Sequence, residues 1–572
     1  MRAAFVLRVR FLLAGVVLVG LVLTTRLYFV QVVHGDAYGE QATQQYVRST
    51  HNIFDRGSIY FTLRTGERIA AASIRTGYML AINPMRITDV DRTYEALSRI
   101  IELDEESFKE RASRPDDPYE EIANRIEPAD ADAIVALRLP GVHLYREQWR
   151  HYPGNHLGSH ILGFVGYGHN GHVLHGQYGL ERYWESVLER ESSKLYVNFF
   201  AEVFTGLRDL IHDEGFTRQG SLVTTVEPIV QQSLETILTR AQEDWGARQL
   251  GGIVIDPRTG GIYALASLPS YNPNHLYLTG NSQVFRNILV ENVYEMGSII
   301  KPIALAIGLD TGAITAETTY NDTGSVVIDT ATIRNFDGRA RGVVDMQAVL
   351  NNSLNVGMAY MTRKVGTQVL GERMRAFGFG EETGIDLPFE VRGLIDNLDS
   401  PRDLEYATAS FGQGIALTPI ATVRALSALA NGGNLITPHL VQAIDYYKGG
   451  EGRVAPDDKV RVLSPEASEE ITRMLVDTVD TTLRGGNVKK DRYSIAAKTG
   501  TAQIAREGAR GYEEGRYLHS LFGYFPAYDP QFLIFLFHVE PQGAQYASET
   551  LTEPFMEMVD LLINYYEVPP DR

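Results

Sequence analysis

Two pairs of strand-like segments, far apart in the chain, constrain its fold most. Residues 252–255 and 262–267 are separated by a short turn with Pro and Gly, and residues 521–524 and 532–539 by a second short turn. Strands joined by so few residues pair in antiparallel fashion. Apolar side chains then recur every three or four residues from Phe555 to Tyr566, which predicts an amphipathic helix. We therefore expect an α/β (α+β) domain in which an antiparallel sheet is covered by helices.

The N-terminus carries a charge-free apolar run over residues 11–25, with arginines at positions 2, 8 and 10 before it and Arg26 after it. The run is shorter than the roughly 20 residues that span a bilayer. Because arginine side chains can extend to the headgroups, Phe5–Val30 is predicted to be one transmembrane anchor. A cleaved signal peptide is the alternative, although no small-x-small cleavage site follows. The basic residues predict a single-pass cell-membrane protein with a cytoplasmic N-terminus, and the chain after about residue 35 is expected to be extracytoplasmic.

The chain of 572 residues has room for several domains, and its composition divides it into three parts. Residues 1–35 hold the cytoplasmic N-terminus and the anchor. Residues 36–220 mix short strand-like runs with an acidic helical stretch, Thr93–Leu137, broken at Pro115–Pro118. They are expected to form an irregular, elongated domain. Residues 221–572 contain the predicted sheet and its helices.

Charge and composition exclude some classes of function. The chain has 53 Lys and Arg against 71 Asp and Glu, a net charge of -18, and no basic stripe, so nucleic-acid binding is not expected. Cysteine is absent, which removes disulfides, thiolate metal sites and a cysteine nucleophile. Several histidines fall in one stretch, but their spacing matches no zincin motif, and neither a metal nor another cofactor is expected. These histidines are His151, His156, His160, His169, His172 and His175.

Ser298 and Lys301 open an apolar helical segment, residues 303–309, and stand one turn apart on one face. A hydroxyl becomes a good nucleophile when a base removes its proton. A lysine amine is such a base only if burial or a second cation lowers its pKa. The start of a helix also favours negative charge at the hydroxyl. Alone, this spacing is weak, because a capping serine and a surface lysine give the same pattern.

Two later segments supply the other groups that such a pair needs. Residues 353–355, Ser-Leu-Asn, offer a second hydroxyl that can relay a proton between Lys301 and a leaving amine, and an amide that can hold a substrate amide. Residues 498–501, Lys-Thr-Gly-Thr, follow in a strand-like setting. Their lysine would lower the pKa of the Lys301 amine, and their threonine hydroxyls can bind a carboxylate. Their glycine lets a peptide lie against the strand.

Ser-x-x-Lys, Ser-x-Asn and Lys-Thr-Gly in this order resemble the three signatures of the penicillin-recognising serine acyltransferases. The chain as a whole is similar to the class B penicillin-binding proteins, the monofunctional peptidoglycan D,D-transpeptidases of division and elongation. Arg56-Gly57-Ser58-Ile59 looks like the family's Arg-Gly-x-Ile opening, and Tyr152-Pro153 and Gly179-Leu180-Glu181 look like its pedestal landmarks. Ser410-Phe411-Gly412-Gln413-Gly414 looks like a landmark of its transpeptidase domain.

The resemblance implies that residues 36–220 form a non-catalytic pedestal domain, and that residues 221–572 have the penicillin-binding transpeptidase fold and catalyse acyl transfer. Ser298 would attack the D-Ala-D-Ala carbonyl of a stem peptide and release D-alanine, and an amine of a neighbouring strand would take the acyl group. β-Lactam antibiotics are the implied inhibitors, and a SEDS glycosyltransferase with other division or elongation membrane proteins the implied partners. Backbone N–H groups of Ser298 and Thr501 would form the oxyanion hole. The implied catalytic residues are Ser298, Lys301 and Ser353, and the implied substrate-binding residues are Asn355, Lys498, Thr499, Gly500 and Thr501.

Other proteins of this fold are alternatives. A class A β-lactamase uses a Glu-x-x-x-Asn loop, and none occurs between Asn355 and Lys498. A β-lactam sensor or a catalytically idle divisome scaffold would keep the fold, but a scaffold would most naturally have lost Ser298 or Lys301. Compared with the family, Met296 replaces a more usual Pro, and the two isoleucines after Ser298 replace a more usual Thr-Phe. These differences bear on β-lactam affinity more than on the acyl-transfer reaction. Landmark residues 410–414 favour a division-type enzyme over an elongation-type one.

Overall fold

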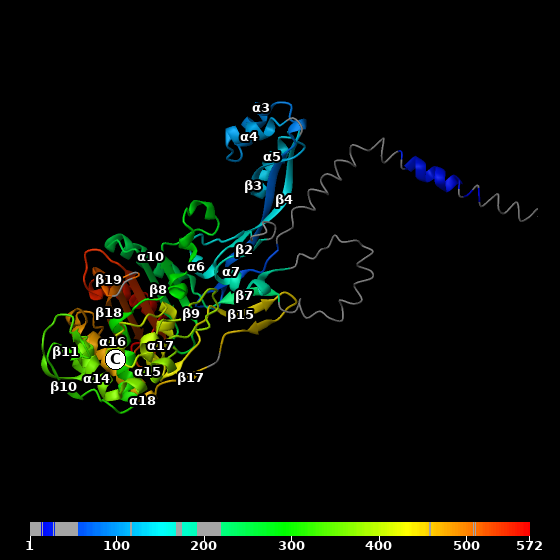
Figure 1. Ribbon diagram of the computed structural model, residues 1–572. Helices are drawn as coiled ribbons and strands as arrows, with labels where there is room; N and C mark the ends of the chain where they lie inside the picture. Colours follow the sequence, from blue (N-terminus) through cyan, green and yellow to red (C-terminus); the bar gives the residue numbers. More distant parts are fainter. Residues whose placement is uncertain are drawn as a thin grey trace, which may run out of the picture. The chain divides into compact units, whose positions relative to one another are not determined.

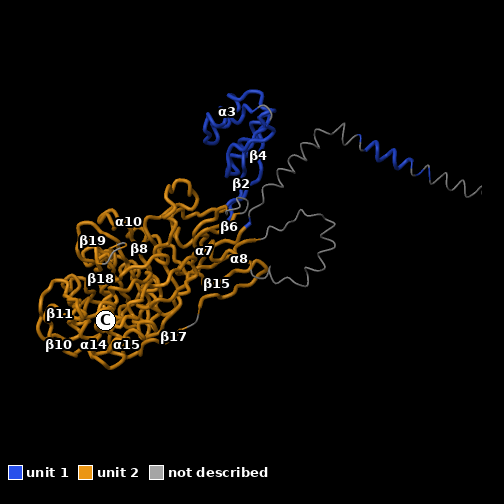
Figure 2. The backbone as a smooth tube through the Cα atoms, viewed as in Figure 1, with its two compact units in different colours: residues 1–55, 74–149, 191–197 blue, residues 56–73, 150–190, 198–572 orange. Residues whose placement is uncertain are grey.

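The structure is a computed structural model, and it describes residues 13, 15, 17–26, 28, 55–114, 117–167, 174–190, 219–456, 459–506, 508 and 511–572. The chain divides into two compact units (Figure 2). One unit comprises residues 1–55, 74–149 and 191–197, and the other comprises residues 56–73, 150–190 and 198–572. The domain boundaries expected at residues 35 and 220 stay predictions.

About half of the predicted anchor, Phe5–Val30, lies outside the described residues. Residues 17–26 are helical, as are the few described positions beside them. Within the described part of the chain, no helix has both the length and the apolar character needed to cross a bilayer. The transmembrane span therefore stays a prediction.

The first unit combines a long strand with helices. The second half of β2 (Arg68–Ile82) pairs antiparallel with β3 (Glu120–Ile126), with Ala81 opposite Glu121. The prediction of helix throughout Thr93–Leu137 is therefore wrong at β3. Pairing with β2 and burial of Ile126 outweigh the helix propensity of the Glu and Ala residues there. The helices of this unit are α3 (Val90–Ser98), α4 (Glu105–Ala112) and α5 (Pro128–Ala136).

A five-stranded antiparallel sheet forms the centre of the second unit, in the order β18-β19-β20-β8-β9 (Figure 1). Both predicted hairpins are confirmed, as β8–β9 and β19–β20, and the two hairpins are joined through β20 and β8. The predicted C-terminal helix is confirmed as α20 (Thr552–Tyr566). The strands are β8 (Gln249–Ile255), β9 (Ile262–Leu268), β18 (Ala496–Ala505), β19 (Tyr512–Phe525) and β20 (Phe532–Val539).

Helices cover both faces of this sheet, and the central strand β20 is apolar at nearly every position. Phe535 and Phe537 point to the side of α12, where Ile303 is buried in the same cluster. Leu536 points to the opposite side, with residues of α10 and α20 such as Phe555. The helices that matter below are α10 (Pro228–Trp245), the 3-10 turn η5 (Gly297–Ile300), α12 (Lys301–Asp310), α14 (Asn355–Val365), α17 (Pro419–Ala430) and α19 (Ala547–Thr550).

A second sheet in the same unit joins segments from distant parts of the sequence. Strand β1 (Ile59–Thr62) pairs parallel with β7 (Gly220–Thr224), which in turn pairs antiparallel with β15 (Val441–Tyr446). Strand β7 therefore belongs to this sheet rather than to the one that carries the hairpins. The sheet ties residues 56–73 to the C-terminal part of the chain.

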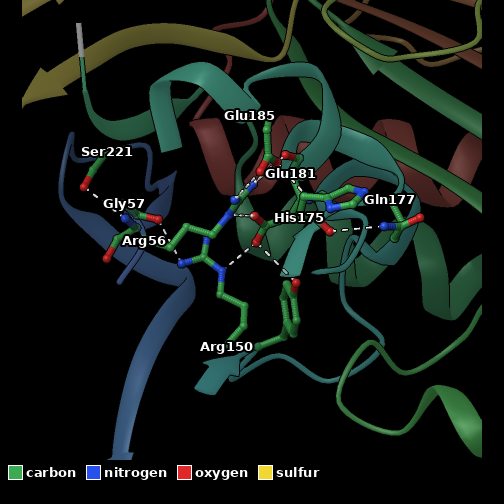
Figure 3. A network of polar contacts seen from close by, with 11 residues as sticks. Arg56, Gly57, Arg150, His175, Gln177, Glu181, Glu185 and Ser221 are labelled. Atoms are coloured by element: carbon green, nitrogen blue, oxygen red, sulfur yellow. Dashed lines mark hydrogen bonds and ion pairs between the residues drawn. The ribbon is translucent and has the colours of Figure 1, made fainter. Parts of the chain in front are cut away.

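A buried ion cluster lies beside this second sheet (Figure 3). The Glu181 carboxylate is fully buried and accepts hydrogen bonds from Arg56 at 2.5 Å and from Arg150 at 2.6 Å. Arg56 also binds the Glu185 carboxylate, and Tyr152 donates its hydroxyl hydrogen to Glu181 at 3.2 Å. Burial alone raises the pKa of the Glu181 carboxyl, but the two arginines outweigh it and hold the pKa below its usual value. The family-like segments at Arg56, Tyr152 and Glu181 therefore meet in one charged cluster.

Candidate active site

Ser298 lies in the 3-10 turn η5, directly before helix α12. Gly297 starts this turn with a φ of 65°, and a Cβ atom on it would lie 3.3 Å from the backbone carbon of Thr501. The residues from Ile303 to Ile307 are fully buried against the sheet and fix the helix in place. Ser298 itself is half-buried. The turn thus holds the first motif close to strand β18, which carries the third.

The Lys301 side chain is completely buried and reaches the second motif. Its Nζ lies 2.6 Å from the Ser353 carbonyl oxygen, 3.1 Å from the Ser353 hydroxyl and 2.8 Å from Asn355 Oδ1. Ser353 has a φ of 55°, an unusual value for a residue with a side chain. This backbone turn aims the carbonyl and hydroxyl oxygens of one residue at the same amine.

Electrostatics make Lys301 suitable as a base. Burial, and then the positive charge of Lys498, lower the pKa of the Lys301 amine well below its usual value. Burial also lowers the pKa of Lys498, to about 8. The ring of Phe411 lies 5.9 Å from the Lys301 Nζ, so the amine faces an aromatic surface rather than water. A neutral amine can accept the proton of a nearby hydroxyl, which an ammonium group cannot.

The third motif lies on β18, next to the turn that carries Ser298. A Cβ atom on Gly500 would meet Ser520 Oγ at 2.5 Å and the Met296 carbonyl oxygen at 2.8 Å, so only glycine fits there. Ser520 donates to the Met296 carbonyl at 2.9 Å and thereby ties β19 to the turn. Lys498 donates to the Thr499 carbonyl at 2.9 Å.

Thr501 faces α19 at the far end of the motif. Its hydroxyl oxygen accepts a hydrogen bond from the Ala547 amide at 3.0 Å and can still donate to a substrate carboxylate. The structure thus brings together all three motifs: Lys301 bonds to Ser353 and Asn355, and the Ser298 turn packs on the strand of Lys498–Thr501. The catalytic role of each residue stays a prediction.

Several residues that support the site were not predicted. Glu295 accepts hydrogen bonds from the Gly414 amide at 3.1 Å and the Tyr512 hydroxyl at 3.0 Å, and so connects the segment before Ser298 to two others. Ser520 and Phe411 contact the site as described above. Of these residues, only Phe411 stands in a segment that gave a signal, because residues 410–414 resemble a landmark of the family. Glu295, Tyr512 and Ser520 stand in no sequence pattern that assigns them a role at the site.

The histidine stretch offers no metal site among the described residues, where no group of three or more potential ligands is found. His169 and His172 lie outside the described residues. His160 is buried, and its Nε2 lies 2.9 Å from the Val284 carbonyl. Its ring also meets Tyr271 edge to face. These contacts are those of a histidine in an apolar core.

Comparison with known families gives two matches along the chain. The penicillin-binding protein transpeptidase domain matches residues 251–559, more than half of the chain, and the penicillin-binding protein dimerisation domain matches residues 55–199. The chain belongs to the class B penicillin-binding proteins. The resemblance inferred from the three motifs is therefore confirmed.

Relatives of this penicillin-binding protein cover most of its length. Stage V sporulation protein D of Bacillus subtilis is 29% identical over 557 residues, which cover 96% of this chain and 84% of the relative. Peptidoglycan D,D-transpeptidase MrdA of Acinetobacter baumannii is 27% identical over 577 residues, which cover 92% of this chain and 84% of the relative.

Solved structures support the same fold. Penicillin-binding protein 2X of Streptococcus thermophilus has a TM-score of 0.72 at 20% identity, covering 91% of this chain and 81% of that one. Penicillin-binding protein 3 of Mycobacterium tuberculosis, complexed with aztreonam, has a TM-score of 0.68 at 21% identity, covering 91% of this chain and 98% of that one. At such identities the likeness concerns the fold alone.

Proposed function

We propose that this chain is a membrane-anchored peptidoglycan D,D-transpeptidase that cross-links stem peptides in cell-wall synthesis. The observation that carries the proposal is the position of Lys301. Its buried amine contacts Ser353 and Asn355, and its pKa is lowered by burial and then by the charge of Lys498. A hydroxyl one turn away, at Ser298, can then be deprotonated. The name of the Acinetobacter relative supports this assignment.

In the proposed reaction, Ser298 Oγ attacks the carbonyl carbon of the penultimate D-Ala while its proton moves to Lys301. The C–N bond to the last D-Ala then breaks, and that proton returns through the Ser353 hydroxyl to the leaving amine. An ester between Ser298 and the stem peptide results. The amine of a neighbouring stem peptide attacks this ester, forms the new amide and gives its proton back to Ser298.

Binding of the substrate is assigned to the remaining motif residues. Asn355 would hold a substrate amide, and Gly500 would let the acyl donor lie against β18. The hydroxyls of Thr499 and Thr501, with Lys498, would bind the terminal carboxylate, and the backbone N–H groups of Ser298 and Thr501 would stabilise the oxyanion by about 2.7–4 kcal/mol each.

The test is acylation of the full chain in detergent by benzylpenicillin, followed by intact mass. β-Lactam binding is supported by fold neighbours solved with aztreonam and with ampicillin. We expect a persistent adduct on the native chain, none on Ser298→Ala, and an unchanged adduct on the control Ser427→Ala, a buried serine of α17 that bonds to the Val423 carbonyl. Fast turnover without adduct would instead indicate a β-lactamase, and neither adduct nor turnover would indicate an idle scaffold.

The cellular role is proposed to be division, with a SEDS glycosyltransferase as partner and the catalytic domain outside the cytoplasmic membrane. Support comes only from family resemblance, including residues 410–414. Depletion of the protein distinguishes the two roles: filamentous cells would support division, and rounded cells would indicate elongation.

A further inference from the structure

A buried polar pair, Asp322 and Asn335, lies next to the second motif, at the ends of two small strand ladders. Strands β10 (Thr319–Asp322) and β13 (Gly342–Asp345) form one antiparallel pair, and β11 (Ser325–Ile328) and β12 (Ala331–Arg334) form a hairpin in the chain between them. Asp322 ends β10 and Asn335 follows β12, and their exposed fractions are only 1% and 3%. Buried polar groups of this kind need hydrogen-bond partners.

The carboxylate of Asp322 fixes the orientation of the Asn335 amide. Asn335 Nδ2 donates to both carboxylate oxygens of Asp322 at 3.0 Å and to the Arg339 carbonyl at 3.3 Å. The Gly324 and Arg341 amides also donate to the same carboxylate. Because a carboxylate accepts and does not donate, the NH₂ group of Asn335 must face Asp322. Its Oδ1 must therefore face the other way.

That oxygen holds the start of helix α14. Asn335 Oδ1 accepts a hydrogen bond from the Val356 amide at 3.1 Å, one of the amides that have no partner inside the helix. The adjacent carbonyl, of Arg334, accepts from Asn355 Nδ2 at 3.0 Å. With its NH₂ group held there, Asn355 presents Oδ1 to the Lys301 Nζ, 2.8 Å away.

We propose that Asn335, held by Asp322, is a positioning residue that acts through Asn355 on Lys301. This inference rests on the proposed function. Asn335 holds the backbone directly after Asn355, at the Val356 amide, and the carbonyl of the residue before Asn335 holds the Asn355 amide. One acceptor of the Lys301 amine therefore stays in place while the amine exchanges protons with Ser298. The other two acceptors come from Ser353, which Asn335 does not contact.

The test is the kinetics of β-lactam acylation of the full chain in detergent, resolved into the limiting acylation rate and the dissociation constant of the first complex. We expect Asn335→Ala to lower the limiting rate about tenfold, the equivalent of one hydrogen bond, with little change in the dissociation constant. In an Asn355→Ala background the same substitution should cause no further loss. An unchanged rate in the native background, or losses that multiply, would overturn the proposal.

A matched control separates positioning from stability. Asn431 is half-buried and binds the Pro257 and Asn434 carbonyls at 2.7 and 2.8 Å, so Asn431→Ala removes comparable bonds at the end of α17. It should lower stability and leave the acylation rate unchanged.

If Asn335→Ala does not fold, the isosteric Asp322→Asn tests the same link. The new NH₂ group would be a donor that faces the N–H donors now bound to the Asp322 carboxylate, so it could not accept from them. A rate equal to that of the native chain in a folded Asp322→Asn protein would contradict the proposal.

A second measurement keeps this inference apart from the proposed function. If the native chain is not acylated by benzylpenicillin, the proposed function fails, and the inference is judged on the Lys301 amine itself. Competitive labelling with acetic anhydride at several pH values, read by peptide mass spectrometry, gives the apparent pKa of that amine. Asn335→Ala should lower it, because the ammonium form loses a fixed acceptor. An unchanged or raised pKa would overturn the inference.

Discussion

Replacing Glu181 by Gln should lower the free energy of unfolding by about 3–5 kcal/mol, because it removes the shared anion of a buried cluster. Gln has nearly the same size and shape, so packing is kept and only the charge is lost. The Glu181 carboxylate is not exposed to solvent and binds Arg56 at 2.5 Å and Arg150 at 2.6 Å (Figure 3).

The magnitude follows from the two ion pairs. At an effective dielectric constant near 20, unit charges about 4 Å apart attract by about 4 kcal/mol, so two pairs give about 8 kcal/mol. Desolvation of the carboxylate offsets part of this attraction. After the substitution Arg56 keeps Glu185, whereas Arg150 keeps the Gly57 carbonyl and has no carboxylate left. The expected net loss therefore comes mainly from one buried cation without a counter-charge.

The assay is equilibrium urea unfolding followed by tryptophan fluorescence. Trp184 directly precedes Glu185 in the sequence and so reports on the surroundings of the ion cluster. The control is Glu382→Gln, whose partner Arg392 is 71% exposed; it should change the free energy by less than about 1 kcal/mol. Adding Arg150→Met to Glu181→Gln should recover part of the loss, because the orphaned cation is removed. A loss for Glu181→Gln as small as that of the control would refute the electrostatic reasoning.

Two further predictions concern pH and packing. Burial lowers the pKa of three histidines from 6.5 in the unfolded chain to about 4, 4 and 3 in the folded chain. Below pH 6.5 the unfolded chain therefore binds more protons than the folded chain. The contribution of these histidines to the free energy of unfolding is fully present above pH 6.5 and should fall by about 2 kcal/mol per histidine at pH 5. A urea midpoint that stays constant from pH 7.5 to 5 would contradict this. The histidines are His160, His519 and His538. Gly500→Ala should cost about 1–3 kcal/mol and slow β-lactam acylation at least tenfold, because its Cβ would displace the Met296 carbonyl. Gly261→Ala, whose Cβ would meet only side chains at 3.3 Å or more, should acylate normally.

The sequence predicted those parts of the fold that depend on local patterns. Both hairpins follow from strand-like runs joined by short turns, and the C-terminal helix follows from helical periodicity over adjacent residues. Pairing between distant segments does not: nothing local indicates that β20 pairs with β8, or that β1 lies beside β7. The missed strand β3 has the same cause, since Glu120–Ile126 is a strand only because β2 offers it a partner.

The candidate site shows the same limit at the level of single side chains. Motif order identifies Ser298, Lys301 and Asn355, because each belongs to a spacing with a chemical purpose. Asn335 has no such spacing, and it becomes important only because a buried carboxylate at Asp322 determines which end of its amide faces α14. A chain can therefore keep every motif residue and still acylate slowly if the polar groups behind them change. Reactivity in this fold should depend on the hydrogen bonds that orient Asn355 as well as on Asn355 itself.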